Sequence, residues 1–193
     1  MAGKQAKIIS NHELRQILDD VKKSRYPLRN EVMVLLSMKA GLRAKEISCV
    51  TWSMVTNASG ELIDALQLPH RASKGKSGRT IPLNAALKTA LEKLYATHDH
   101  NSSPYIIKSQ YGHKMTPGGV CQWFKNMYVR LRLDGCSSHS GRRTFGTKAA
   151  CLISTAGGHI TDVQKLMGHS SLSMTALYLE PNPEAQRKLV DII

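Results

Sequence analysis

Residues 167–178 read MGHSSLSMTALY and place a tyrosine, Tyr178, nine residues after the pair Gly168-His169. Glycine often ends a helix, because it adopts the left-handed conformation of a C-cap at little steric cost. Taken alone, the segment is therefore compatible with a helix cap followed by a packed aromatic residue. Its chemical meaning depends on the residues that precede it.

Two segments with arginine stand upstream of this tyrosine. His139-Ser140-Gly141-Arg142-Arg143 places a histidine and an arginine three residues apart, so that both share one face of a helix. Such a pair can hold an anion, because arginine forks and helix N-termini both bind phosphate. Further upstream, Arg43 follows Gly41-Leu42 at a predicted helix start. Alone, each arginine is more simply explained as a solvated side chain.

A basic turn separates two short strand-like segments. Residues 61–68 have strand-like composition, and residues 79–83 (RTIPL) suggest a returning strand. Between them, residues 71–78 read RASKGKSG. Because this stretch is rich in Gly and Ser, it predicts a mobile hairpin that carries Lys74 and Lys76.

Apolar residues recur at helical spacing along most of the remaining chain. We expect residues 1–9 to form a flexible basic N-terminus and residues 10–193 to form one domain. The fold class is therefore predicted as mainly α with a small antiparallel β-sheet. Helices are expected over residues 10–21, 28–39, 44–50, 84–95, 116–131, 139–155, 161–167, 171–178 and 184–192, with a short third strand at 105–107.

The charge balance points to a polyanionic partner. The chain has 193 residues, with 27 Lys and Arg against 14 Asp and Glu and a net charge of +13. Such a field favours nucleic acid, although a basic surface without function or an affinity for anionic lipid gives the same composition.

The four cysteines form no CxxC pair, so neither a zinc site nor a redox motif is expected. Without a signal peptide or an apolar run of about 18 residues, a cytoplasmic protein is expected.

Together, these segments resemble the tyrosine recombinase family, and the resemblance spans residues 10–190. Each motif is degenerate, but their shared order and spacing make a chance match untenable. The resemblance implies the catalytic-domain fold of that family. Residues 41–46 correspond to the family's Gly-Leu-Arg-x-x-Glu segment, and residues 74–83 correspond to its Lys-Gly turn before an Arg-x-(Val/Ile)-Pro-Leu strand. Residues 139–142 correspond to its His-x-x-Arg box, and residues 167–178 correspond to its Leu-Gly-His with a later tyrosine.

The resemblance implies transfer of a DNA phosphodiester without metal, cofactor or ATP. Arg43 and Arg142 would neutralise the non-bridging oxygens of the phosphate, and His169 would supply a third donor. Tyr178 would attack the phosphorus and form a covalent 3′-phosphotyrosyl link. The sequence contains no Gly-x-x-x-x-Gly-Lys-Ser/Thr loop and no cluster of carboxylates suited to two metals.

Proton transfer requires two further groups. His139 is expected to be the base or proton shuttle, because imidazole titrates near neutrality. Lys74 is expected to protonate the leaving 5′ oxygen, with Lys76 as its rival; alignment on the Ile-Pro-Leu of residues 81–83 favours Lys74. Glu46 is expected to hold an arginine or to polarise a neighbouring residue. The candidate DNA contacts are Lys45, Lys76, Arg79 and Arg143.

Two departures from the family pattern affect what is expected of the whole protein. Arg143 stands where histidine usually follows the box arginine, and the N-terminal helical domain that most members carry is expected to be absent.

The partner that the resemblance implies is double-stranded DNA. It would be bound by a homotetramer that is a monomer when free, and no membrane is involved. The apolar residues of 184–193 would dock on a neighbour or pack on their own domain.

Two other functions remain open at this point. A type IB topoisomerase uses the same chemistry to relax supercoils alone, although the spacing from Gly168-His169 to Tyr178 argues against it. A DNA-binding regulator that lost strand transfer would keep the fold but would have no need for the nucleophile.

Overall fold

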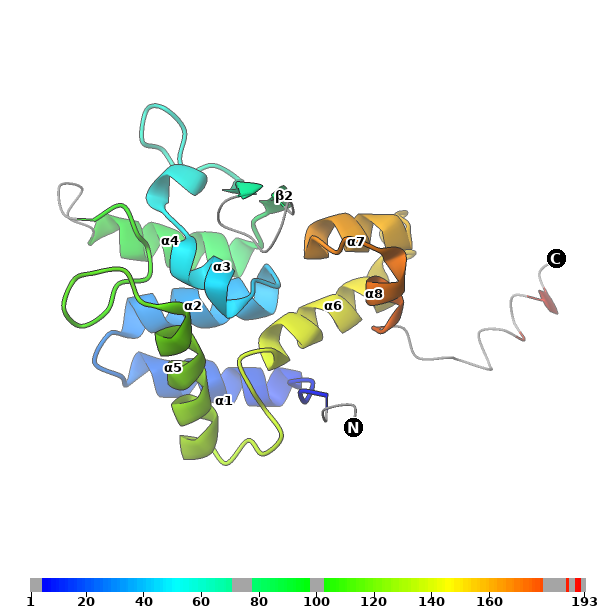
Figure 1. The fold of residues 1–193 in the computed structure, drawn as a ribbon, viewed down its shortest axis with the longest axis horizontal. Helices are drawn as coiled ribbons and strands as arrows, with labels where there is room; N and C mark the ends of the chain where they lie inside the picture. Colours follow the sequence, from blue (N-terminus) through cyan, green and yellow to red (C-terminus); the bar gives the residue numbers. More distant parts are fainter. Residues whose placement is uncertain (1–4, 71–77, 98–102, 179–186, 188–189, 192–193) are drawn as a thin grey trace.

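The helices gather around α2 (Figure 1). The computed structural model describes residues 5–70, 78–97, 103–178, 187 and 190–191. The helices of the larger body are α1 (Asn11–Lys22), α2 (Pro27–Lys39), α3 (Ala44–Cys49), the 3-10 turn η1 (Trp52–Met54), α4 (Ala85–Ala96) and α5 (Pro117–Arg130). From this body α6 (Ser140–Leu152) extends towards α7 (Ile160–Met167) and α8 (Leu172–Ala176). The mainly helical class is confirmed.

Short-range capping signals set several helix ends. Ser10 accepts from the N–H of Glu13 at 3.2 Å, while the Glu13 carboxylate accepts from the N–H of Ser10 at 2.8 Å, which completes a capping box for α1. Asn84 and Thr116 cap α4 and α5 with their side chains alone, which accept from the N–H groups of Ala86 and Gly119. After α2, Gly41 takes a φ of +64°, and a Cβ there would lie 2.5 Å from the ring of Phe145. Both the positive φ and the nearby ring of Phe145 therefore disfavour any residue with a side chain at this turn.

The sheet has two strands in the part of the chain that the structure describes. β1 (Ala65–Leu68) pairs antiparallel with β2 (Arg79–Pro82), with Leu66 opposite Ile81. Both of these side chains are buried in the core. The prediction of a third strand at 105–107 is wrong: Tyr105 makes an isolated bridge to Thr51, and no ladder extends from it.

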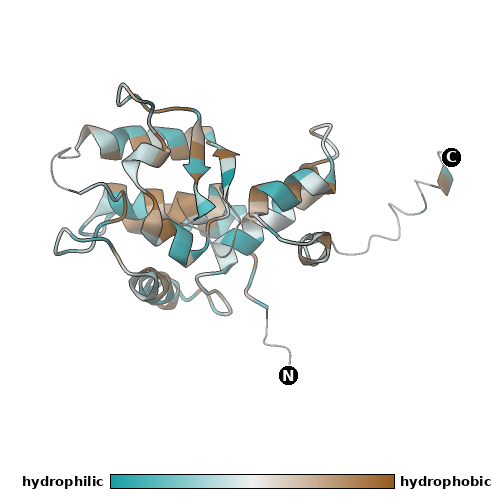
Figure 2. Cartoon of the chain, turned by 45° about the horizontal axis from the view of Figure 1, so that its top comes forward, coloured by the Kyte–Doolittle hydropathy of each residue, from teal (hydrophilic) through white to brown (hydrophobic). Residues whose placement is uncertain are grey.

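The buried apolar residues form two separate clusters. The larger cluster is built around α2, which buries residues on all sides, and Figure 2 shows hydrophobic residues where the helices of this body face one another. The smaller cluster consists of Ala150, Val163 and Met167, with Phe145 and Tyr178 packed against it. The segment that carries Tyr178 thus has a small core of its own. Of the helix predicted over 184–192, only three residues are described.

Residues 5–9, which the sequence suggested would be flexible, instead run along α6. The side chain of Ile9 is fully buried, and its N–H donates to Oγ1 of Thr144 at 2.8 Å. The N–H of Lys7 donates to the carbonyl of Gly135 at 2.9 Å, and Arg143 donates to the carbonyl of Ala6 at 2.8 Å. The described part of the N-terminal segment is therefore part of the folded body.

Candidate active site

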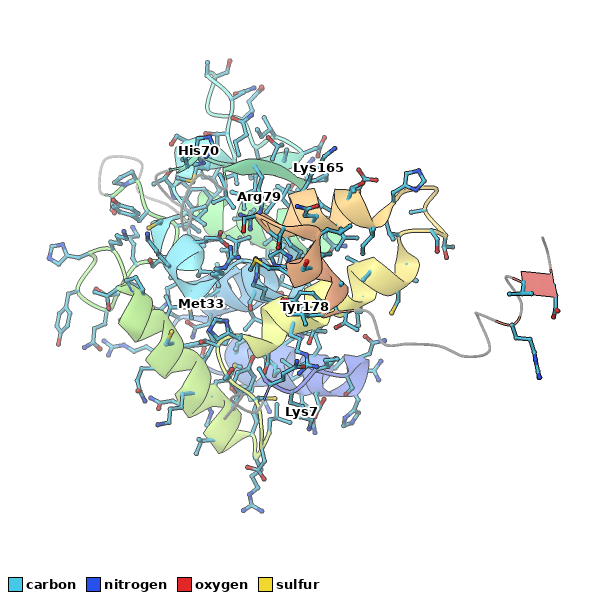
Figure 3. The ribbon with its side chains drawn as sticks, turned by 45° about the vertical axis from the view of Figure 1, so that its right-hand side comes forward. Lys7, Met33, His70, Arg79, Lys165 and Tyr178 are labelled. Atoms are coloured by element: carbon cyan, nitrogen blue, oxygen red, sulfur yellow. The ribbon has the colours of Figure 1, made fainter. Side chains whose placement is uncertain are left out.

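Two adjoining hollows lie where α6, α7 and α8 meet α3 and β2. A cleft of about 1370 Å³ is lined by Arg43 and Arg79 among others, and a smaller pocket of about 240 Å³ is lined by Arg142 and Tyr178. His169 lines both hollows. Figure 3 shows Tyr178 close to the end of α8 and Arg79 on the neighbouring strand. The fold thus brings together residues that are far apart in the sequence.

Arg142 is held by two backbone carbonyls. Its Nη1 donates to the carbonyl of Gly41 at 2.7 Å and its Nη2 to the carbonyl of Met167 at 2.6 Å, and the residue is only 4% exposed. Burial, and then the charge of Arg43, lower the pKa of the Arg142 guanidinium to about 10, so that it stays cationic at neutral pH. Met167 ends α7, where the helix dipole favours a cation.

Glu46 links two further arginines. The carboxylate is fully buried and accepts from Nη1 of Arg43 at 3.2 Å and from both terminal nitrogens of Arg79 at 3.0 and 3.2 Å. Burial alone would raise the pKa of Glu46, but the hydrogen bonds and charge of Arg79, together with those of Arg43, leave the pKa below its usual value. These contacts show that Glu46 holds Arg43 and Arg79, and its part in catalysis stays a prediction.

Arg79, which was predicted to contact DNA, is mostly buried. Its side chain is 6% exposed, and besides Glu46 it binds the carbonyl of Leu166 through Nε at 2.7 Å. A Cβ on Gly168 would lie 2.8 Å from Nη1 of Arg79, and Gly168 has a φ of +61°. Arg79 therefore ties β2 and Glu46 to the C-terminal end of α7, although one edge of it lines the cleft.

His169 and Tyr178 stack on one another. Their ring centroids are 5.7 Å apart with an interplanar angle of 12°. Burial, followed by the charges of Arg142, Arg43 and Arg79, lowers the pKa of His169 to about 4. The imidazole is therefore neutral at physiological pH and carries a single N–H.

The other predicted site residues divide into three groups. His139 is exposed at the N-cap of α6, not within the helix, and lines the pocket with Arg142 and Tyr178. Arg143 lines the same pocket, while Lys45 is exposed on α3. Lys74 and Lys76 lie outside the described residues.

Sequence reasoning missed Lys165 and Thr175. Lys165 is exposed on α7 and lines the cleft (Figure 3), whereas Thr175 is fully buried beside His169. A hydroxyl residue between the Gly-His pair and the tyrosine was the available signal for Thr175, but neither its burial nor its partner can be identified from spacing. No helix within the described part of the chain has the length and apolar character needed to cross a bilayer.

Residues 7–185 match the Phage integrase family. Tyrosine recombinase XerA of Pyrococcus furiosus is 26% identical over 188 residues, which cover 96% of this chain and 61% of the relative. Tyrosine recombinase XerC of Myxococcus xanthus is 28% identical, with coverage of 96% and 61%. The chain thus spans about three fifths of the length of these curated relatives.

Two solved structures have the same fold. The Tn1549 transposon integrase in complex with a circular intermediate DNA superposes with a TM-score of 0.76 at 17% identity, covering all of this chain and 67% of that one. The XerH site-specific recombinase bound to its difH substrate gives a TM-score of 0.73 at 17% identity, with coverage of 100% and 55%.

Proposed function

Because the chain belongs to the Phage integrase family, we propose that it is a site-specific DNA recombinase that cleaves and rejoins strands through Tyr178. The reaction passes through a covalent 3′-phosphotyrosyl intermediate and uses neither metal nor ATP. No external energy source is required, because the tyrosyl ester conserves the energy of the broken phosphodiester bond.

The excess of positive charge around Tyr178 carries this proposal. Arg43, Arg79 and Arg142 lie around the site, and Glu46 is the carboxylate that pairs with two of them. The cluster favours an anion, and a phosphodiester supplies one. Fixed arginine donors stabilise charge on the non-bridging oxygens as the phosphorus becomes five-coordinate.

Each remaining group has one task in the reaction. His169, being neutral, donates a hydrogen bond to a non-bridging oxygen. His139 accepts or relays the phenolic proton of Tyr178. The 5′ oxygen leaves with a proton from Lys74, and the reverse of these steps joins the 3′ phosphate to a new 5′ hydroxyl.

The choice between Lys74 and Lys76 can be decided by the leaving group. Lys74→Ala should slow cleavage of ordinary DNA but not of a substrate whose leaving 5′ oxygen is replaced by sulfur, because a thiolate leaves without a proton. Lys76→Ala is the matched control. The opposite pattern would assign the proton to Lys76.

We further propose that the chain acts on double-stranded DNA in the cytoplasm and assembles as a tetramer on two sites. The Tn1549 integrase and XerH, which share this fold, are each bound to DNA in their solved structures, and this supports the DNA partner. Sedimentation velocity should detect a monomer without DNA and four subunits on paired sites. A single subunit bound to cleaved DNA at every protein concentration would refute the tetramer.

The test of strand transfer begins with selection of a binding site from a random duplex library. A nick placed just 3′ of the cleavage position then lets the short fragment with the new 5′ hydroxyl diffuse away, so that a covalent adduct accumulates and survives denaturant. Tyr178→Phe should abolish the adduct, whereas Tyr111→Phe, at a residue 77% exposed, should not change it.

Each other outcome favours a named alternative. An adduct that persists in Tyr178→Phe removes the nucleophile assigned here. Site binding without an adduct from wild type indicates a DNA-binding regulator. Relaxation of supercoiled plasmid that lacks the selected site indicates a type IB topoisomerase.

A further inference from the structure

Thr175 contacts both of the residues that stack at the centre of the site. It is fully buried on α8, and its Oγ1 lies 2.9 Å from Nδ1 of His169. Its backbone carbonyl accepts from the N–H of Tyr178 at 3.0 Å. One residue thus connects the imidazole to the backbone of the proposed nucleophile.

The backbone of His169 is held separately from its ring. The N–H of His169 donates to the carbonyl of Gln164 at 3.1 Å, and the side-chain amide of Gln164 donates to the carbonyl of His169 at 3.2 Å. Neither bond restrains rotation of the imidazole. The hydroxyl of Thr175 is the polar contact at the ring itself.

The direction of this hydrogen bond decides which ring nitrogen carries the proton. A neutral imidazole has one donor and one acceptor nitrogen, and the hydroxyl can serve as either partner. Across the described residues, the hydroxyl of Thr175 makes no hydrogen bond other than the one to His169. A buried hydroxyl proton needs an acceptor, so it points to Nδ1. The imidazole proton must then be on Nε2.

We propose that Thr175 is a positioning residue that fixes His169 in the Nε2–H tautomer and orients its donor towards the reacting phosphate. The inference rests on the proposed strand transfer for the role of that donor. The tautomer itself does not depend on any reaction. Burial, followed by the charges of Arg142, Arg43 and Arg79, lowers the pKa of His169 and keeps the ring neutral, so that a single proton must be placed correctly.

Two substitutions separate the hydroxyl from the packing of Thr175. Thr175→Val keeps the shape of the side chain and removes the donor, whereas Thr175→Ser keeps the donor and removes a methyl group. If the role is only to fill space in the buried helix, Val should be the milder change. If the hydroxyl positions His169, Ser should be the milder change.

Nitrogen NMR of the histidine side chains reads the tautomer without DNA. Near neutral pH, wild type and Thr175→Ser should show His169 with a protonated Nε2 and a bare Nδ1. Thr175→Val should show a mixture of the two tautomers, with a folded backbone spectrum. An Nδ1–H tautomer in wild type, or an unchanged tautomer in Thr175→Val, overturns the proposal.

The adduct assay on the selected nicked duplex then tests the consequence for the reaction. Thr175→Val should slow cleavage about 10- to 100-fold, since loss of a whole donor to a developing oxyanion costs about 100- to 1000-fold. DNA affinity should not change, and Thr175→Ser should restore most of the rate. Equal rates in Thr175→Val and wild type refute the role in catalysis.

The two arms distinguish the failure of this inference from that of the proposed function. Absence of an adduct from wild type, together with the expected NMR result, overturns the strand-transfer proposal and leaves Thr175 as the residue that sets the tautomer. A normal wild-type adduct with an unaltered tautomer in Thr175→Val overturns the inference alone.

Discussion

Glu46 keeps a buried carboxylate between Arg43 and Arg79. Glu46→Gln would leave the buried guanidinium of Arg79 without its counter-charge, and we expect it to lower the free energy of unfolding by about 3 kcal/mol. Urea denaturation measures this change. Glu92→Gln, at an exposed position of α4, is the matched control and should stay within about 0.5 kcal/mol of wild type. An equal effect of the two substitutions would contradict the structural role of Glu46.

The low pKa of His169 predicts a dependence of stability on pH. The folded value of about 4 lies below the ordinary value of 6.5, so between these values the unfolded chain binds more protons than the folded one. The free energy of unfolding should therefore fall as pH drops through this window. Denaturation of His169→Asn, which keeps an acceptor for Thr175, should show a smaller fall. Parallel curves for the two proteins would refute the shift.

At the level of residues, the sequence predicted which side chains meet but not all of their roles. Arg43, His139, Arg142, His169 and Tyr178 line adjoining hollows, as the motif order predicted. Arg79 was predicted to contact DNA, because the sequence could not reveal its ion pair with Glu46, 33 residues away, or its bond to Leu166, 87 residues away. Such contacts depend on tertiary packing, which local spacing does not encode.

On the element scale, α6 is built to receive the ring of Tyr178 at Gly146. A Cβ there would lie 2.9 Å from two ring carbons of Tyr178 and from Cε of Met167. Gly146→Ala should therefore displace Tyr178 and slow adduct formation about 100-fold, as expected for a small misplacement of a reacting group. DNA affinity, measured by fluorescence anisotropy, should be unchanged.

The control is a helical glycine with open space around it. Gly118 on α5 meets nothing within 4 Å, so Gly118→Ala should leave the adduct rate unchanged and raise stability by up to about 1 kcal/mol. A similar adduct rate in both variants would contradict the close approach at Gly146.

The elements themselves were predicted well where their signals are local. Ser10, Asn84 and Thr116 cap their helices through residues two or three positions away, so the helix starts could be read from the sequence. The third strand was wrong, because residues 105–107 have strand-like side chains but pair with the irregular backbone at Val50 and Thr51. Strand formation depends on a partner that composition does not reveal.

For the whole molecule, the division into two apolar clusters predicts uneven stability. The cluster of Ala150, Val163 and Met167 is much smaller than the one around α2. We expect native-state hydrogen exchange to show α7 opening at a lower free energy than α2, because a unit with few buried contacts opens more readily. Equally slow exchange in both helices would show that the polar bonds of Arg79 and Arg142 make one cooperative unit.

The same division determines what a spectroscopic experiment can observe. Both tryptophans, Trp52 and Trp123, pack with the cluster around α2. An unfolding curve followed by tryptophan emission therefore reports the larger body and does not detect an earlier unfolding of α7 and α8. Circular dichroism of the backbone responds to all helices. A gap between the midpoints of the two signals would measure how independently the Tyr178 segment can detach while the rest of the protein stays folded.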